Sequence, residues 1–161
     1  MVYQFAAMSE AHASEIAAWM YEPPYDFYDM KDEIGAEKEL LDGSYLAVFD
    51  ESGLAGYVCF GRNARIPDGE KKGMYTGTNV LDIGLGLKPD RTGKGEGAVF
   101  LREVLDYIEQ MQSVSLVRLT VAMFNERAIR VYKSCGFITV QLLQTNASHD
   151  ERTYVIMECR V

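Results

Sequence analysis

The hydrophobic and polar residues of this chain alternate in short segments. Within each segment, the apolar residues recur with the spacing of either a strand or a helix. Residues 80–87 form an apolar run with the length of a buried strand. Further on, apolar side chains recur at three- and four-residue steps, which is typical of one face of a helix; they are Phe100, Leu101, Val104, Leu105, Ile108 and Met111. Between these blocks stand three glycines at alternate positions, Gly93, Gly95 and Gly97. The pattern predicts a strand, a glycine-rich turn and a helix in succession.

The remaining pattern predicts six more strands and three more helices. The strands are expected at residues 2–7, 44–49, 54–62, 138–143 and 154–160, and through the alternating positions Leu119, Val121 and Met123. The helices are expected at residues 9–20 (Ser9 as N-cap; Ile16, Trp19 and Met20 on the apolar face), at 32–41, and through Ala128, Ile129, Val131 and Tyr132. Residues 63–76 and 144–152 are polar and are expected to form loops.

The last of these helices carries signals at both ends. Asn125 precedes it and is a good N-cap residue. Gly136 stands where a C-cap glycine would, and Phe137 begins the next apolar run. This segment therefore reads as a strand, a capped helix and a further strand.

The glycine-rich turn has the features of an anion site. Alternate glycines remove side chains and permit positive φ, and the N–H groups that open the following helix have no partner within it. The helix dipole also favours a negative charge there. A P-loop is a poor fit because Gly93-Lys94 is followed by Gly95, and the spacing G-x-G-x-G differs from the dinucleotide fingerprint. An ordinary loop that uses glycine only to turn is the competing interpretation.

Together, the two segments resemble the GNAT superfamily of N-acetyltransferases. The cofactor motif of that family is approximately (V/L)-x-P-x-x-(Q/R)-G-x-G-x-(G/A), and residues 87–97 match it except that Thr92 stands at the Gln or Arg position. The second motif, N-x-x-A-x-x-x-Y-x-x-x-G-F, is matched at every fixed position, by Asn125, Ala128, Tyr132, Gly136 and Phe137. Since backbone N–H groups are the phosphate donors, Thr92 is not expected to abolish cofactor binding.

The resemblance implies an α/β (α+β) fold in one domain, residues 1–161. Its centre would be a mixed, mostly antiparallel, twisted sheet of about seven strands, flanked by about four helices. It also implies acetyl-CoA as co-substrate, with the pantetheine arm pairing like an extra strand with Leu85 and Leu87 beside Gly86. The pyrophosphate would lie on the segment formed by Thr92, Gly93, Lys94, Gly95, Glu96, Gly97 and Ala98, and Asn125 could orient cofactor amides besides capping its helix.

Two residues are candidates for catalysis. Tyr132 would protonate the departing thiolate, because a phenol of pKa ~10 stays protonated at neutral pH whereas a thiol has a pKa near ~8.5. Its alternative role is helix packing. Asp82 lies in an otherwise apolar strand and is a candidate general base, with a structural salt bridge, a solvent-facing strand edge or a chain of waters as the competing accounts. Some relatives place a glutamate where this chain has Thr120, which cannot serve as a base.

The charge, the hydropathy and the cysteine and histidine content of the chain limit the functions that are expected of it. The net charge of −8 argues against a nucleic-acid partner and agrees with a cationic amine, with acidity for solubility alone as the favoured competing explanation. No apolar run is long enough to span a membrane, and no signal peptide is expected. Cys59, Cys135 and Cys159 lack metal spacing, as do His12 and His149, so no metal is expected. A reducing cytoplasm fits best.

The sequence thus predicts acetyl transfer from acetyl-CoA to a primary amine, of a small molecule or of a protein N-terminus or lysine. The alternative is a non-catalytic acyl-CoA-binding regulatory module. An aromatic, proline-containing segment at residues 19–28 could contact a cationic acceptor or serve only as a packing lid. The identity of the acceptor and the oligomeric state, including a homodimer, stay open.

Overall fold

The computed structural model describes residues 3–31, 33–111, 113–145 and 152–161, and within these ranges it contains seven strands and five α-helices. The strands are β1 (Gln4–Ala7), β2 (Tyr45–Asp50), β3 (Gly53–Phe60), β4 (Val80–Leu87), β5 (Leu116–Ala122), β6 (Ile138–Gln144) and β7 (Thr153–Arg160). The helices are α1 (Glu10–Ala17), α2 (Ala36–Leu40), α3 (Pro67–Lys71), α4 (Glu96–Met111) and α5 (Glu126–Ser134).

The strands pair in the order β1-β2-β3-β4-β5-β7-β6. Strands β4 and β5 are parallel, whereas the pairs β1–β2, β2–β3, β5–β7 and β6–β7 are antiparallel. The predicted mixed, mostly antiparallel sheet of seven strands is therefore confirmed.

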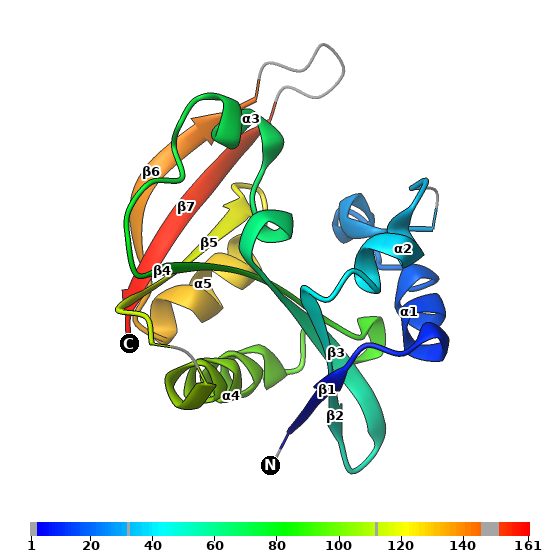
Figure 1. The fold of residues 1–161 in the computed structure, drawn as a ribbon. Helices are drawn as coiled ribbons and strands as arrows, with labels where there is room; N and C mark the ends of the chain where they lie inside the picture. The colour runs from blue at the N-terminus through cyan, green and yellow to red at the C-terminus, as the bar shows by residue number, and fades with distance from the viewer. Residues whose placement is uncertain (1–2, 32, 112, 146–151) are drawn as a thin grey trace. The chain divides into compact units, whose positions relative to one another are not determined.

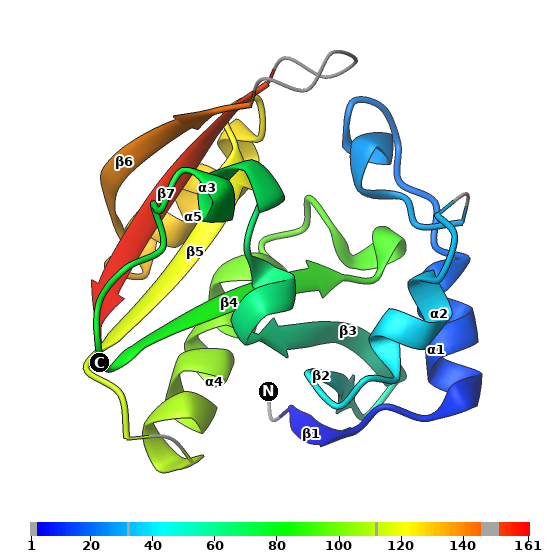
Figure 2. The same cartoon turned by 45° about the horizontal axis from the view of Figure 1, so that its top comes forward.

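Contacts divide the chain into two compact units, and strand β4 runs from one into the other. The first unit comprises the chain up to Cys59 together with Leu85–Glu96. In it, β1, β2 and β3 form an antiparallel meander, and β2 and β3 are joined by a tight turn in which Ser52 N donates to Asp50 Oδ1 (2.9 Å). Helices α1 and α2 lie next to each other (Figure 2). The core of this unit includes Ile16, Leu40, Ala47, Val48 and Val58.

The second unit comprises Phe60–Gly84 and Gly97–Val161. Its strands β5, β7 and β6 run side by side (Figure 1). On one face of β7, Cys159 Sγ donates to Cys135 O (3.8 Å) at the end of α5, so α5 covers this face. On the other face, α3 covers Leu143, whose Cδ2 lies 3.0 Å from where a Cβ on Gly69 would stand.

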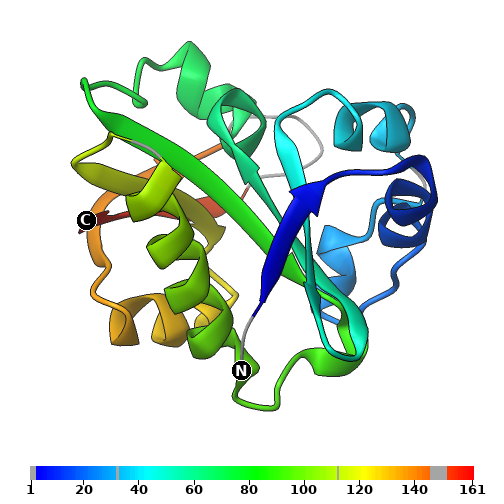
Figure 3. The ribbon, with the colours of Figure 1, turned by 60° about the horizontal axis from the view of Figure 1, so that its bottom comes forward.

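Helix α4 confirms the predicted apolar face. Phe100, Leu101, Val104 and Ile108 are buried, whereas Met111 at the end of the helix is 62% exposed. Figure 3 shows the first turn of α4 next to α5, and a Cβ at Gly97 would lie 3.3 Å from Val131 Cγ2. The first turn of α4 therefore packs closely against α5.

The first helices are shorter than the periodicity predicted. Helix α1 ends at Ala17, because the amides of Ala18 and Trp19 bond to carbonyls three residues back, which tightens the last turn. Trp19 is buried beyond the helix, whereas Met20 is 60% exposed and does not belong to an apolar face. Helix α2 begins at Ala36 because Gly35 has a φ of 84°, which interrupts the expected helix.

Residues 63–76 are not only loop. They contain α3, which the sequence analysis missed because its five residues, PDGEK, have no apolar periodicity. Pro67 at the first helical position was the available signal. Gly69 is buried in this helix, and a Cβ there would lie 2.7 Å from Tyr75 Cε2, so only glycine leaves room for the tyrosine ring.

Candidate active site

The second half of β4 extends beyond its pairing with β5. The parallel register runs from Val80↔Leu116 to Ile83↔Leu119, and the rest of β4 follows after it. In the first unit, the hydroxyl of Tyr21 donates to Leu87 O (2.7 Å), and burial raises the pKa of that phenol above its ordinary value. This bond ties Tyr21, near the start of the aromatic segment at residues 19–28, to the strand expected to carry the cofactor.

Gly86 is required by the packing of the strand. A Cβ at this position would stand 2.5 Å from Tyr57 Cε1, a distance that no side chain tolerates. Tyr57 in turn lies among aromatic rings, with centroids 6.2 Å from Trp19 and 5.9 Å from Tyr45. The space left by the missing side chain of Gly86 is therefore filled by Tyr57.

The loop after β4 is held by a partly buried ion pair. Lys88 N donates to Ala55 O (2.8 Å), and Pro89–Arg91 form a short 3₁₀ turn. Arg91 Nη1 donates to Asp50 Oδ2, and Nη2 donates to Oδ1 (2.9 Å). These hydrogen bonds hold the pKa of Asp50 below its ordinary value, and the carboxylate is only 3% exposed. Thr92 Oγ1 donates to Pro89 O (2.8 Å), so this hydroxyl closes the turn.

The three alternate glycines serve two different purposes. Gly93 and Gly95 have φ values of 73° and 81°, which other residues rarely adopt, and a Cβ on Gly95 would meet nothing within 4 Å. Gly97 instead allows α4 to approach Val131 of α5. The first two glycines shape the loop and leave its surface open, whereas the third sets the distance between two helices.

The residues of this loop fit the pyrophosphate of coenzyme A. Helix α4 begins at Glu96 directly after Gly95, which has no side chain to accept hydrogen bonds from the first N–H groups of the helix. An anion would satisfy them, and the helix dipole favours it. Gly93, Lys94 and Gly95 are exposed, so the described residues of the first unit leave the surface of this turn open.

Helix α5 is capped at both ends as predicted. Asn125 Oδ1 accepts a hydrogen bond from Ala128 N (3.1 Å). At the other end, Gly136 N donates to Lys133 O (3.1 Å) and Phe137 N donates to Tyr132 O (3.0 Å), with Gly136 at a φ of 100°. This is a Schellman motif, which commonly includes an apolar contact between the flanking residues.

The ring of Tyr132 makes that apolar contact. Its centroid lies 6.1 Å from the centroid of Phe137, and Tyr132 is half-buried. Cys135, at the C-cap, donates from Sγ to Ala98 O (3.7 Å) in the first turn of α4. In the second unit, the helix that carries Tyr132 is thus in direct contact with the first turn of α4. The packing of Tyr132 against Phe137 uses only the ring of the tyrosine.

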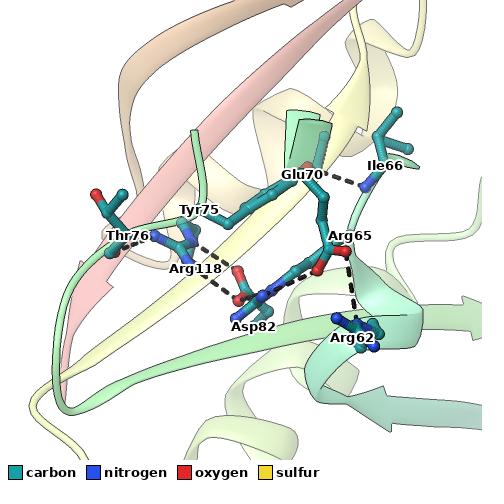
Figure 4. A network of polar contacts seen from close by, with 9 residues as sticks. Arg62, Arg65, Ile66, Glu70, Tyr75, Thr76, Asp82 and Arg118 are labelled. Carbon is teal, nitrogen blue, oxygen red and sulfur yellow. Dashed lines mark hydrogen bonds and ion pairs between the residues drawn. The ribbon is translucent and has the colours of Figure 1, made fainter. Parts of the chain in front are cut away.

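Asp82 lies in a network of ion pairs (Figure 4). Arg118, directly opposite in the parallel register, donates from Nε to Oδ1 (2.6 Å) and from Nη2 to Oδ2 (2.9 Å). Arg65 Nε donates to Oδ2 (2.8 Å). The carboxylate is 2% exposed, and both of its oxygens are engaged. These contacts favour the salt-bridge interpretation of Asp82 over the general-base interpretation.

Tyr75 extends the same network. Its ring lies 5.5 Å from the guanidinium carbon of Arg65 and 5.1 Å from that of Arg118. Its hydroxyl accepts a hydrogen bond from Ile66 N (3.1 Å) and lies 2.9 Å from Thr120 Oγ1. Figure 4 shows the side chain of Tyr75 directed toward Ile66, with the arginines beside it.

Sequence reasoning missed most of these partners. Asp82 stood out as an acidic residue in an apolar strand, but Arg65, Tyr75 and Arg118 are separated from it by up to 36 residues. Arg118 offered one signal, since it is a charged residue among the apolar positions of β5. Asp50, at a hairpin turn, gave no sign of its pairing with Arg91.

A comparison with family models identifies the chain. The model of the GNAT acetyltransferase family matches residues 7–137, which is well over half of the sequence. The chain belongs to the GNAT acetyltransferase family. This GNAT protein is therefore an acetyl-CoA-dependent N-acetyltransferase, and the family and co-substrate predicted from the two motifs are confirmed. A comparison with curated proteins finds no match.

Solved GNAT structures share the fold. Spermidine N-acetyltransferase from Vibrio cholerae in complex with CoA and spermine gives a TM-score of 0.65 at 19% identity, over 98% of this chain and 95% of that one. AAC(6')-Ib in complex with paromomycin and acetyl-CoA gives 0.73 at 16% identity, over 99% and 94%. A GNAT acetyltransferase from Bacillus anthracis gives 0.72 at 12% identity, over 99% and 95%.

Two findings concern metals and membranes. Among the residues that the structure describes, no group of three or more His, Cys, Asp or Glu side chains is placed to hold a metal ion. None of the helices in the described part of this GNAT protein combines the length and hydropathy needed to cross a bilayer. His149 lies outside the described residues.

Proposed function

We propose that this enzyme transfers the acetyl group of acetyl-CoA to a primary amine, carried by a small molecule or by a protein N-terminus or lysine. The contact between the first turn of α4 and α5 carries the proposal, because it joins a turn suited to an anion with the helix that bears Tyr132. The net charge of −8 supports a cationic acceptor through long-range attraction.

The cofactor would be held mainly by backbone groups. The N–H groups from Gly93 to Ala98 would bind the pyrophosphate at the start of α4, and Lys94 would add a positive charge. Leu85 and Leu87 would pair with the pantetheine amides, because the ladder with β5 ends at Ile83 and leaves this half of β4 beyond it. Asn125, which caps α5, would orient an amide of the cofactor. Bound acetyl-CoA supplies the thioester carbonyl that the amine attacks.

Tyr132 would act as the general acid. Its phenol would give a proton to the thiolate as the carbon–sulfur bond breaks, since a phenol remains protonated at neutral pH. The ring contact with Phe137 fixes the side chain at the end of α5, which would hold the hydroxyl in one position.

Asp82 would act as an anchor for Arg65 and Arg118. Both oxygens of its carboxylate already accept hydrogen bonds from these two guanidinium groups. The ammonium form of the acceptor would therefore lose its proton to water rather than to Asp82.

Calorimetric titration with acetyl-CoA tests the proposal, followed in the same cell by a panel of amines and peptides with a free-thiol readout. Binding of acetyl-CoA followed by thiol release on an amine is the expected result and would name the substrate class. Binding without release on any amine would contradict the proposed acceptor class, and no binding would contradict the role given to the loop.

A further inference from the structure

The end of strand β4 makes a contact that the proposed function does not explain. The hydroxyl of Tyr21 donates to Leu87 O (2.7 Å), and Leu87 is one of the two residues proposed to pair with the pantetheine arm. Tyr21 and Leu87 both belong to the first unit. The same carbonyl oxygen therefore has two prospective donors, which are the phenol and a pantetheine amide.

Leu87 O points to the edge of β4 that faces away from β3. In a strand, the N–H and C=O groups of successive residues point to opposite edges. Lys88 N donates to Ala55 O of β3 (2.8 Å), so the polar groups of the preceding residue, Leu87, point to the other edge. On that edge, the ladder of β4 with β5 ends at Ile83. A pantetheine arm that adds to this edge as an extra strand would bond with Leu87 O.

The phenol of Tyr21 is a well-placed donor. Its oxygen lies 2.7 Å from Leu87 O, which is the usual distance of an O–H···O hydrogen bond. Burial, and to a smaller extent the charge of Asp29, raises the pKa of the phenol above its ordinary value, so it keeps its proton at neutral pH. Because an added strand lies along the whole edge, the phenol takes up space that the arm needs as well as its acceptor.

The backbone around Tyr21 is held by bonds that do not involve β4. Tyr21 N donates to Asp29 Oδ1 (2.9 Å), which closes the segment from residue 21 to residue 29. Within it, Tyr25 N donates to Glu22 O (2.8 Å), and Asp29 N donates to Asp26 O (3.0 Å). A rotation of the Tyr21 side chain about its own bonds therefore removes the phenol from Leu87 O and leaves these three hydrogen bonds in place.

We propose that Tyr21 competes with the pantetheine arm of acetyl-CoA for Leu87 O, and that its hydroxyl leaves this carbonyl when the cofactor binds. The inference rests on the proposed function and extends it by naming a residue that lowers the affinity for the cofactor. A pantetheine N–H takes the place of the phenolic O–H, and no covalent bond changes. Tyr21 is half-buried, so water can accept the hydrogen bond of the released phenol.

The variant Tyr21→Phe tests the inference, because it keeps the ring and deletes the competing donor. Acetyl-CoA would no longer have to break the hydrogen bond to Leu87 O before it binds. Its affinity, measured by calorimetry, should therefore rise roughly 5-fold, the effect of one hydrogen bond. Damage to the fold would lower the affinity, so a gain cannot come from a misfolded variant.

A fragment of the cofactor assigns the effect to the pantetheine arm. The nucleotide half of coenzyme A, 3′-phospho-ADP, has the phosphates of the cofactor and lacks the arm. It should bind equally to the wild type and to Tyr21→Phe, because nothing in it approaches Leu87 O. The gain in affinity should thus appear with acetyl-CoA alone.

Thermal melting provides a second readout. Without cofactor, Tyr21→Phe should have a lower Tm than the wild type, because it lacks the bond to Leu87 O. At saturating acetyl-CoA the gap should close, since the bond is then absent from both proteins.

The matched control is Tyr45→Phe. It deletes the bond from another phenol of the first unit, which donates to Glu39 Oε2 (2.7 Å). This variant should keep the wild-type affinity for acetyl-CoA, and any difference in its Tm should be the same with and without the cofactor.

Equal affinity of Tyr21→Phe and the wild type for acetyl-CoA would overturn the inference, because Leu87 O would then serve both donors through its two lone pairs. Weaker binding by Tyr21→Phe would overturn it too, since the phenol would then support the cofactor. An equal gain with 3′-phospho-ADP would show that the pantetheine arm is not involved. Each of these results leaves the proposed function intact, whereas a wild type that binds no acetyl-CoA would contradict the proposed function itself.

Discussion

Two arginine–aspartate pairs, one partly buried and one fully buried, serve the two units of this enzyme in different ways. In the first unit, Arg91 binds Asp50 and holds the loop that leads into α4. In the second unit, Arg118 binds Asp82, which Arg65 also contacts, and together they hold Tyr75. The first pair positions backbone groups, and the second positions side chains. The same chemistry therefore holds a backbone turn in one unit and an aromatic side chain in the other.

Tyr132→Phe tests the role of side chains in the second unit and should have the largest effect on activity. The variant keeps the ring that packs against Phe137 and removes only the proton donor. We expect kcat to fall on the order of 10²–10⁴-fold, while the affinity for acetyl-CoA stays nearly constant. Steady-state kinetics with the free-thiol readout and calorimetry measure the two quantities. Unchanged kcat would contradict the acid role and leave Tyr132 as a packing residue.

Gly95→Glu tests the role of the backbone groups in the loop that leads into α4. The new side chain places a carboxylate where an anion would bind and imposes a side chain on a residue with a φ of 81°. We expect acetyl-CoA affinity to fall at least about 100-fold, which corresponds to like-charge repulsion plus the loss of several N–H contacts.

The matched control for this variant is Gly73→Glu. Gly73 also has a positive φ (66°) and open space around its Cα, but it follows α3 in the second unit. It should show the same backbone strain, seen as a modest fall in Tm, and bind acetyl-CoA normally. Equal binding by Gly95→Glu and the wild type would mean that the phosphates bind elsewhere.

The glycine-rich loop with its neighbouring helix ends and the network around Asp82 differ in how much of each could be predicted from the sequence. The glycine spacing, the cap at Asn125 and the Schellman end at Gly136 are local features, so the sequence predicted them and the structure confirms the helix ends. The network around Asp82 depends on residues 65, 75 and 118, which only the fold brings together. The short helix α3 was missed for a related reason: Pro67 was a weak local signal, and tertiary contacts at Gly69 stabilise the helix.

Asp50→Asn and Asp82→Asn sharpen the comparison by breaking each ion pair in turn. Asp50→Asn should cost less stability than Asp82→Asn, because Arg91 is partly exposed and also lies 3.8 Å from Glu96 Oε1. Asp82→Asn should lower the free energy of unfolding by about 3–5 kcal/mol, because the buried guanidinium of Arg118 loses its carboxylate partner. That loss corresponds to roughly 2–4 °C in Tm per kcal/mol for a chain of this size. Only Asp50→Asn should also weaken acetyl-CoA binding, by roughly 10-fold, since Arg91 would no longer hold the loop. Weaker acetyl-CoA binding in Asp82→Asn would contradict the division of roles.

The pH dependence of stability gives the smallest of these effects. Hydrogen bonds from Arg91 lower the pKa of Asp50 in the folded protein below the value of ~3.9 expected in the unfolded chain. The stabilisation is therefore complete above the unfolded-state pKa and is lost as the pH falls through the lower, folded-state pKa. Urea unfolding from pH 6 to pH 3 should show the free-energy gap between wild type and Asp50→Asn narrowing toward acid. A constant gap would mean that the Asp50 charge contributes nothing, and the loop would then be held by the shape of the hairpin rather than by its ion pair.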